Sequence, residues 1–302
     1  MTYAASYKRK RKVNMAAVIK TENLTYVYGE KTPFRKVALD NVNIEINEGE
    51  IVGVIGHTGS GKSTLIQHFN GLLKPTSGRI LVDGEDFAGD KKKLREVRFK
   101  VGLVFQYPEY QLFEETVAKD IAYGPRNMKL PAEEIERRVC ESASLTGLSD
   151  ELLHRSPFEL SGGQKRRAAI AGVMAMEPKV LILDEPASGL DPQGRDRIFD
   201  MLREYHAEKK NTVLIVSHSM EDIAKIADRI LVMNEGSVFC FDKTPKVFCR
   251  AEELEKIGLA VPQVTRVIHR LNAMGFSLGE DVYTVKYAEG QILSRLKAGG
   301  EG

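Results

Sequence analysis

A glycine-rich run in the first quarter of the chain has the residue types that bind phosphate groups. Residues Gly56–Ser63 match the pattern G-x-x-x-x-G-K-[ST] at every fixed position. Glycines let backbone N–H groups approach phosphate oxygens, Lys62 supplies a positive charge, and the Ser63 hydroxyl suits Mg²⁺. An apolar run of strand length, 51–55, precedes the loop and a helical pattern follows it. That context argues against a glycine-rich turn without a ligand and predicts a phosphate-binding loop.

Two carboxylates follow a second apolar run. Val180–Leu183 has the length of a strand, and Asp184 and Glu185 come directly after it. Adjacent side chains on a strand point in different directions, so the two acids can do different work. Asp184 can bind Mg²⁺, and Glu185 can accept a proton from an attacking water. Alone, this pair would indicate only a solvated strand end, but with the phosphate-binding loop it predicts a nucleoside triphosphatase that uses Mg²⁺.

Further short motifs follow in a fixed order along the chain. A Leu-Ser-Gly-Gly-Gln sequence between a phosphate-binding loop and an Asp-Glu pair is highly specific, whereas a lone Ser-Gly-Gly could start any helix. The motifs are Gln106 after the run 101–105, Leu160–Gln164, Ser188–Asp191, and His218 after the run 212–217. With these motifs, residues 17–241 resemble the ATP-binding cassette (ABC) family, the ATPase subunits of ABC transporters.

The resemblance implies a role for each motif. Glu185 is the implied catalytic base, Gln106 contacts Mg²⁺ and the attacking water, and His218 contacts the γ-phosphate. Ser63, Gln106 and Asp184 are the implied metal ligands. The residues implied to bind ATP are Tyr28, Gly56, His57, Thr58, Gly59, Ser60, Gly61, Lys62, Ser63, Thr64, Ser161, Gly162, Gly163, Gln164 and Asp191.

Some of these residues are implied to serve a nucleotide on another subunit. In the ABC family the stretch Ser161–Gln164 reaches the γ-phosphate bound by the opposite chain, and Asp191 lies at that interface. Each ATP site is therefore built from two chains. Tyr28 matches the aromatic residue that stacks on adenine, but Tyr26 is close enough in sequence to be the alternative. His57 stands at a variable position of the loop, so its backbone is expected to matter more than its ring.

Longer stretches narrow the resemblance. The segments 104–116, 117–127 and 164–172 resemble the ATPases of energy-coupling factor transporters, and Thr32–Ala38 resembles an insertion of the second of their two ATPases. This implies an importer of vitamins or transition-metal ions. The implied partners are a homologous ATPase subunit, identical or related, a transmembrane coupling protein and a substrate-binding membrane protein. The implied location is the cytoplasmic face of the cell membrane.

The periodicity predicts how the elements are arranged. Apolar runs that do not alternate with polar residues indicate strands covered on both faces, and the helical patterns between them indicate a parallel α/β sheet. With the resemblance, the expected fold is an ABC-type P-loop cassette with an N-terminal antiparallel β subdomain. The predicted units are a basic disordered tail 1–14, the cassette 15–241 with a helical insertion at about 115–176, a dimerisation domain 242–288, and a flexible tail 289–302.

Composition limits the alternatives. The net charge of +2 includes five basic residues within 1–14, so the rest of the chain carries 39 − 42 = −3. That balance argues against nucleic-acid binding. The three cysteines show no zinc-ligand spacing, and no apolar run approaches the length of a membrane helix. Another ABC importer or exporter, or a cassette acting on nucleic acid, remains the alternative, and the sequence names no transported substrate.

The segment Tyr107–Glu115 mixes aromatic, apolar and acidic residues. Because Pro108 restricts the residue before it, Tyr107 is expected to be extended, with a short helix after it. In energy-coupling factor ATPases this segment grips the coupling protein, and Glu109 and Glu114 are the acids expected to face a basic helix. The alternative is that Leu112 and Phe113 anchor the loop onto the helical insertion.

Overall fold

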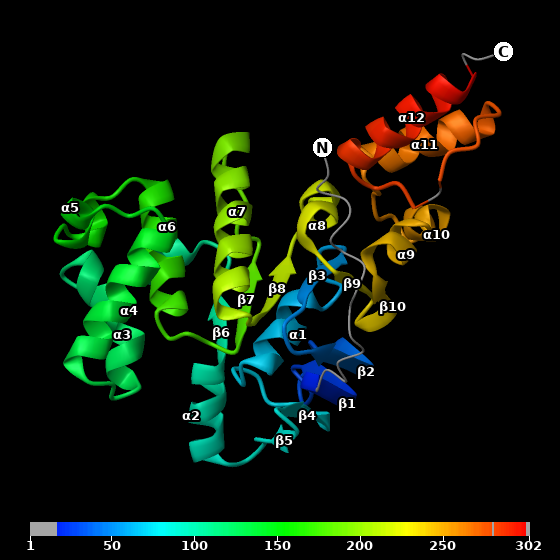
Figure 1. Ribbon diagram of the computed structural model, residues 1–302. Coiled ribbons are helices and arrows are strands. Elements are labelled where there is room, and N and C mark those ends of the chain that lie inside the picture. The colour runs from blue at the N-terminus through cyan, green and yellow to red at the C-terminus, as the bar shows by residue number, and fades with distance from the viewer. Residues whose placement is uncertain (1–16, 280, 300–302) are drawn as a thin grey trace.

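The computed structural model of the chain describes residues 17–279 and 281–299, so the basic segment 1–14 lies outside the described residues. A six-stranded sheet with the order β10-β9-β3-β8-β7-β6 forms the centre (Figure 1). Its strands pair in parallel except for β10, which pairs antiparallel with β9. The strands are β3 (Ile51–Gly56), β6 (Val101–Val104), β7 (Val180–Asp184), β8 (Thr212–Val216), β9 (Arg229–Asn234) and β10 (Ser237–Lys243).

Both faces of the central sheet are buried, which explains apolar runs without alternation. Along β7, Leu181 and Leu183 belong to one buried cluster, whereas Val180 and Ile182 belong to a second. Because consecutive side chains of a strand point to opposite faces, each face needs its own apolar set. The first cluster includes residues of α7 (Pro192–Lys209) and α8 (Met220–Ile226), and the second includes residues of α1 (Lys62–Phe69) and α2 (Lys91–Lys100).

A smaller antiparallel sheet flanks the core. Its order is β2-β1-β4-β5, and β1 pairs antiparallel with both β2 and β4. The expected N-terminal antiparallel subdomain is therefore present. The apolar residues of β1 and β2 share the second buried cluster with α1, which places this sheet beside the phosphate-binding loop. The strands are β1 (Ala17–Tyr28), β2 (Lys36–Asn47), β4 (Ser77–Val82) and β5 (Glu85–Asp86).

Helices fill the chain between β6 and β7, in the region where the sequence predicts a helical insertion. They surround a cluster of their own that includes Leu112, Ile121 and Leu153. In Figure 1 they form a lobe at one side of the central sheet. The helices are η1 (Pro108–Gln111), α3 (Val117–Asn127), α4 (Ala132–Leu145), α5 (Asp150–Leu153), η2 (Pro157–Glu159) and α6 (Gly162–Met174).

The C-terminal part divides into a portion packed on the core and a terminal helix pair. Phe248 and Leu254 belong to the buried cluster of α7 and α8, whereas Ile268 and Val282 belong to a separate small cluster. Figure 1 shows the terminal helices α11 and α12 lying together at one end of the molecule. The helices are α9 (Thr244–Phe248), α10 (Ala251–Lys256), α11 (Gln263–Ala273) and α12 (Val285–Gly299).

The flexible tail predicted for 289–302 is wrong over residues 289–299, because α12 continues to Gly299. Ala288 and Ile292 are four residues apart, so they lie on one face of this helix, and both belong to the terminal cluster. Leu293 and Leu296 continue the apolar spacing beyond the predicted boundary at 288. The prediction instead gave more weight to the glycine-rich end of the chain, and that choice missed the helix.

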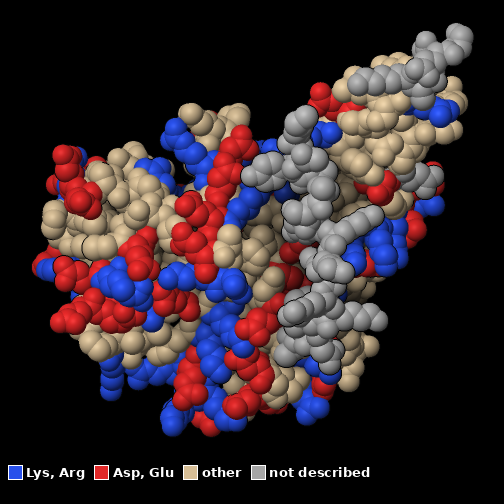
Figure 2. All heavy atoms as spheres, in the orientation of Figure 1, with Lys and Arg blue, Asp and Glu red and all other residues tan. Residues whose placement is uncertain are grey.

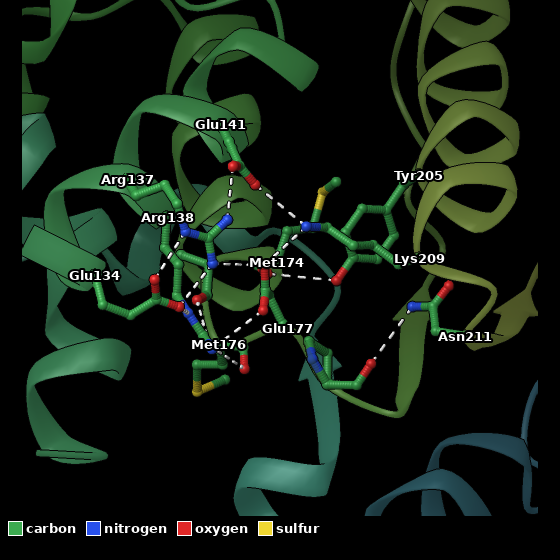
Figure 3. A network of polar contacts seen from close by, with 12 residues as sticks. Glu134, Arg137, Arg138, Glu141, Met174, Met176, Glu177, Tyr205, Lys209 and Asn211 are labelled. Carbon is green, nitrogen blue, oxygen red and sulfur yellow. Dashed lines mark hydrogen bonds and ion pairs between the residues drawn. The ribbon is translucent and has the colours of Figure 1, made fainter. Parts of the chain in front are cut away.

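A network of ion pairs joins the helical insertion to the core (Figure 3). Arg138 of α4 contacts Glu134 at 2.6 Å and Glu177 at 3.1 Å, and Lys209 at the end of α7 contacts Glu177 at 2.8 Å and Glu141 at 3.2 Å. Arg138 also donates to the carbonyl of Met176 at 3.1 Å. Hydrogen bonds from Arg137 and from Arg138 hold the pKa of Glu134 down to about 2. Figure 2 shows acidic and basic side chains intermingled over this face.

Candidate nucleotide-binding and catalytic site

The phosphate-binding loop joins β3 to α1 in a conformation that requires glycine. Gly61 has φ +99°, and a Cβ there would lie 2.5 Å from the carbonyl oxygen of Ala38. A Cβ at Gly56 would lie 2.3 Å from the carbonyl oxygen of Met233. Both glycines therefore let the loop close against neighbouring backbone, and α1 begins directly after Gly61 with its N-terminus toward the loop.

Lys62 lies folded over its own loop. Its Nζ donates to the carbonyl oxygens of Gly56 and His57, both at 2.7 Å. Burial lowers the pKa of Lys62, while the nearby carboxylates of Glu185 and Asp184 oppose that shift. The lysine is thus surrounded by oxygen acceptors at the place where the loop would hold phosphates, and phosphate oxygens can replace those carbonyls as its partners.

Asp184 ends β7 and is buried beside the loop. Burial raises its pKa, whereas the Ser63 hydroxyl and the positive charge of Lys62 act in the opposite direction. A buried carboxylate next to a hydroxyl is a donor set that suits Mg²⁺, which prefers oxygen ligands and is bound together with phosphates. Asp184 and Ser63 therefore fit the ion.

Glu185 follows in a strained conformation. Its φ is +52°, and its backbone N–H donates to the carbonyl of Val216 on β8 at 3.0 Å. One carboxylate oxygen, Oε1, lies 3.3 Å from His218 Nε2. Burial raises the pKa of Glu185 to about 7, while burial and Lys62 lower the pKa of His218. A carboxyl with this pKa can take a proton from water near neutral pH.

A pocket of about 320 Å³ brings most of the predicted site residues together. Lys36, Ala38 and Val216 also line it, although sequence reasoning did not single them out. Their only signal is indirect, since Lys36 and Ala38 belong to the 32–38 insertion and Val216 precedes His218 by two residues. The predicted residues in the lining are Tyr28, Thr58, Gly59, Gly61, Lys62, Ser63, Thr64, Gln106, Asp184, Glu185 and His218.

The structure separates the two tyrosines that could contact adenine. Tyr28 lines the pocket, and its hydroxyl lies 3.3 Å from Thr64 Oγ1. Tyr26 packs edge-on against His68, with ring centroids 4.7 Å apart, and against the buried cluster of the antiparallel sheet. Of the two tyrosines, Tyr28 is therefore the one that lines the pocket.

The chain turns sharply after Gln106, contrary to the sequence prediction. Tyr107 has φ +57° and ψ +56°, in the left-handed region, rather than the extended conformation expected before Pro108. The short helix η1 does begin at Pro108 as predicted. Buried Pro108 and the ion pair of Glu109 with Arg166, at 3.3 Å, hold this turn against the local preference of the residue before proline.

The residues of the Leu160–Gln164 motif, the signature, lie outside this pocket. Ser161 caps α6: its hydroxyl accepts from the N–H of Gln164 at 3.3 Å, and Gln164 Oε1 accepts from the N–H of Ser161 at 2.8 Å. Asp191 caps α7 by accepting from the N–H of Gly194 at 2.8 Å. Gly163 and Asp191 line a separate hollow of about 490 Å³. Within one chain, the structure therefore does not bring the signature to the pocket of Lys62.

Comparison with known proteins places this geometry in a family. The ABC transporter family model matches residues 39–188. The energy-coupling factor transporter ATP-binding protein EcfA2 of Clostridium perfringens is 59% identical over 280 residues, with 92% of this chain and 98% of that protein covered. The chain belongs to the ATP-binding proteins of energy-coupling factor transporters. EcfA2 of Caldanaerobacter subterraneus is 54% identical over 92% of this chain and 98% of its own length.

Solved structures of ABC cassettes share the fold. CbiO1 of Clostridium perfringens, described as part of the ABC transporter complex CbiONQ, has a TM-score of 0.72 at 40% identity and covers 84% of this chain and 99% of its own. The dimeric MJ0796 cassette bound to ADP and Pi has a TM-score of 0.67 at 31% identity and covers 74% of this chain and 98% of its own. Among the residues that the structure describes, no helix has the length and apolar character needed to cross a membrane.

Proposed function

We propose that the chain binds ATP with Mg²⁺ in the 320 Å³ pocket and hydrolyses it to drive an energy-coupling factor importer of vitamins or transition-metal ions. One observation carries the proposal: the pocket holds Lys62, Ser63, Asp184 and Glu185 together, from two loops far apart in sequence. The relatives named as energy-coupling factor ATP-binding proteins support the coupling to transport.

Each side chain has a distinct task in this proposal. The loop N–H groups and Lys62 bind the phosphates, and Tyr28 stacks on the adenine ring. Ser63, Asp184 and Gln106 hold Mg²⁺, which neutralises charge on the phosphates when it is bound. Glu185 accepts the proton of the attacking water, and His218, 3.3 Å away, orients that carboxylate and reaches toward the γ-phosphate.

A second ATPase subunit completes the site in this proposal. Ser161, Gly162 and Gly163 lie at the N-terminus of α6, where backbone N–H groups suit a γ-phosphate oxygen. Because they lie outside the pocket of their own chain, they are placed to serve the nucleotide of a partner. The dimeric MJ0796 cassette supports such pairing, and the C-terminal helices α11 and α12 add a second dimer contact in this proposal.

Exposed aromatic residues of the helical insertion form the proposed membrane-protein contact. Tyr110 is 86% exposed and Phe113 is 58% exposed, and Phe113 packs edge-on against Tyr123 with centroids 4.9 Å apart. Phe113 and Tyr123 line a groove of about 300 Å³ between the core and the insertion. Leu112, by contrast, is buried in the cluster of the insertion, as the anchoring alternative expects for that residue.

The acids of this segment are less available than the sequence indicates. Glu109 pairs with buried Arg166 at 3.3 Å, and Glu114 lies 3.7 Å from Arg126. Reversing the charge of Glu109 would therefore disturb the fold as well as any partner contact. The aromatic residues, rather than Glu109 and Glu114, are the side chains on which a docking test should rest.

Two substitutions test the proposed chemistry. Glu185→Gln removes the base and keeps its shape, so we expect intact Mg-ATP binding and hydrolysis slowed by ~10²–10⁴-fold. Lys62→Ala removes the charge that contacts the outer phosphates, so we expect weaker ATP binding. Calorimetry of ATP binding and phosphate release by the assembled complex measure both effects. Near-normal turnover of Glu185→Gln would remove Glu185 from its role.

A further inference from the structure

A short C-terminal segment, residues 257–262 between α10 and α11, and the first residue of α11 contact two elements next to the proposed ATP site: the phosphate-binding loop and α8. At its start, the carbonyl oxygen of Ile257 is in hydrogen-bond contact with His57 Nε2 of the phosphate-binding loop. Immediately after it, the N–H of Gln263 donates to Glu221 Oε1 at 3.3 Å. Glu221 stands in the first turn of α8, three residues after His218. One stretch of chain therefore contacts both the phosphate-binding loop and the helix that follows His218.

The segment is anchored to the core between these contacts. Leu259 and Val261 are buried and belong to the same cluster as Met220 and Ile223 of α8. The helix α8 in turn lies close against β3, because a Cβ at Gly53 would be 2.5 Å from Cγ2 of Ile223. A displacement of the segment would thus press on packed side chains that transmit it to α8 and to the strand that leads into the phosphate-binding loop.

His57 has contacts at both of its ends. Its ring meets Ile257, while its own carbonyl oxygen accepts from Lys62 Nζ at 2.7 Å and from the N–H of Ser60 at 3.1 Å. One of the two residues whose carbonyl oxygens hold Lys62 is therefore itself held by the C-terminal segment. Rotation or release of the ring would shift the carbonyl that partners Lys62.

We propose that His57 is a positioning residue through which segment 257–262 restrains the phosphate-binding loop and sets its affinity for ATP. This inference rests on the proposed role of the loop as the ATP site. It gives the His57 ring a task that its variable position in the loop pattern does not indicate. It also makes ATP binding dependent on the C-terminal part, which contributes nothing to the lining of the pocket among the described residues.

Gly258 offers a way to disturb the ring without changing the loop. It has φ +72°, and a Cβ at this position would lie 3.0 Å from His57 Cε1. Gly258→Ala would push on the ring and also strain the backbone. Gly275 is a matched control, because it has φ +97° and a Cβ there would have no neighbour within 4 Å. Gly275→Ala reproduces the backbone strain in the same part of the chain without the contact.

A double-mutant cycle on the full chain tests the proposal by calorimetric titration with Mg-ATP. We expect His57→Ala to change the ATP dissociation constant by about two- to tenfold, the size of one hydrogen bond, and His57→Gln to restore most of the wild-type value. Gly258→Ala should change the dissociation constant when His57 is present and have no further effect in the His57→Ala background. Gly275→Ala should leave ATP affinity unchanged.

Three results would overturn the proposal: additive effects of His57→Ala and Gly258→Ala, no restoration by His57→Gln, or an equal effect of Gly275→Ala. If His57 had only a structural role, all these variants would have lower thermal midpoints. Their ATP affinities would then not show coupling between His57 and Gly258. A parallel titration of Lys62→Ala distinguishes a failure of the proposed ATP site from a failure of the proposed role of His57. Unchanged affinity in that variant would contradict the loop as the ATP site, whereas weakened affinity with an additive cycle would contradict only the role of His57.

Discussion

Glu185 shows how tertiary burial adjusts a single carboxyl group. The backbone at φ +52° turns the residue out of β7, and burial raises its pKa to about 7. The unfolded chain would hold the same carboxyl near its ordinary value of 4.5. Between pH 4.5 and 7 the folded protein therefore binds more protons at this position than the unfolded chain. It follows that this group favours folding below pH 4.5 and loses that contribution as the pH rises through 7.

Glu185→Gln should therefore stabilise the ATP-free protein at pH 8 relative to wild type. The expected gain in unfolding free energy is up to about 3 kcal/mol, and it should shrink as the pH falls through 7 toward 4.5. Urea denaturation of both proteins at pH 5, 6.5 and 8 measures the difference. A gain that is the same at all three pH values would show that the carboxyl does not have a raised pKa.

At the scale of elements, the N-terminus of α6 combines a structural and a functional task. The reciprocal hydrogen bonds of Ser161 and Gln164 cap the helix, and the same residues form the signature proposed to meet the partner's nucleotide. A capped helix end holds the remaining N–H groups in one direction, toward a phosphate that approaches from outside the chain. The contribution of the cap to stability can be separated from its proposed role at the partner's nucleotide by removing the cap of another helix.

Ser161→Ala should spare ATP binding to the isolated chain and impair hydrolysis by the assembled ATPase pair. Loss of the cap should also lower the unfolding free energy by about 1 kcal/mol. Thr116→Ala is the control, because Thr116 caps α3 by accepting from the N–H of Lys119 at 3.3 Å and lies outside the pocket. We expect a similar stability loss and normal hydrolysis in the control. Loss of ATP affinity in isolated Ser161→Ala would contradict the cross-subunit placement.

The ion-pair network of Figure 3 links the helical insertion to the core, and we expect it to contribute to the free energy of unfolding. The Arg138 side chain is 13% exposed, and its removal leaves Glu134 and Glu177 without one of their partners. Arg138→Ala should lower the unfolding free energy by about 2–4 kcal/mol. Arg203→Ala removes an exposed pair with Asp200 within α7 and an exposed hydrogen bond to the carbonyl of Lys225 at 3.3 Å, and it should cost at most about 1 kcal/mol. Chemical denaturation measures the loss in unfolding free energy of each variant. Equal losses would show that the network between the insertion and the core adds no stability.

At the scale of the whole molecule, the exposed aromatics of the insertion are the expected contact with the transmembrane coupling protein. Tyr110→Asp should weaken capture of that protein in a pull-down and leave ATP binding by the isolated chain unchanged, because a charge replaces apolar contact area. Phe34→Asp is the control, since Phe34 is 87% exposed on the loop between β1 and β2. Undiminished capture by Tyr110→Asp would leave this segment with only an anchoring role.

The sequence by itself determined the features that depend on neighbouring residues. The phosphate-binding loop, the strand that ends in Asp184 and Glu185, and the signature at the start of α6 are contiguous, and each contains its own backbone and chemical requirements. Apolar runs without alternation identified strands buried on both faces, because the period of side chains along a strand is local. These signals were sufficient for the fold class and for the chemistry.

Only the tertiary structure decided which distant residues meet. The parallel order β3-β8-β7 brings the ends of three strands to one edge, and there His218 lies 3.3 Å from Glu185. The same packing places Tyr28, and not Tyr26, in the pocket lining and joins His57 to Ile257, 200 residues away. It also turns Tyr107 against its local preference. Such contacts depend on strand order and on burial shared by several elements, and no single stretch of residues contains that information.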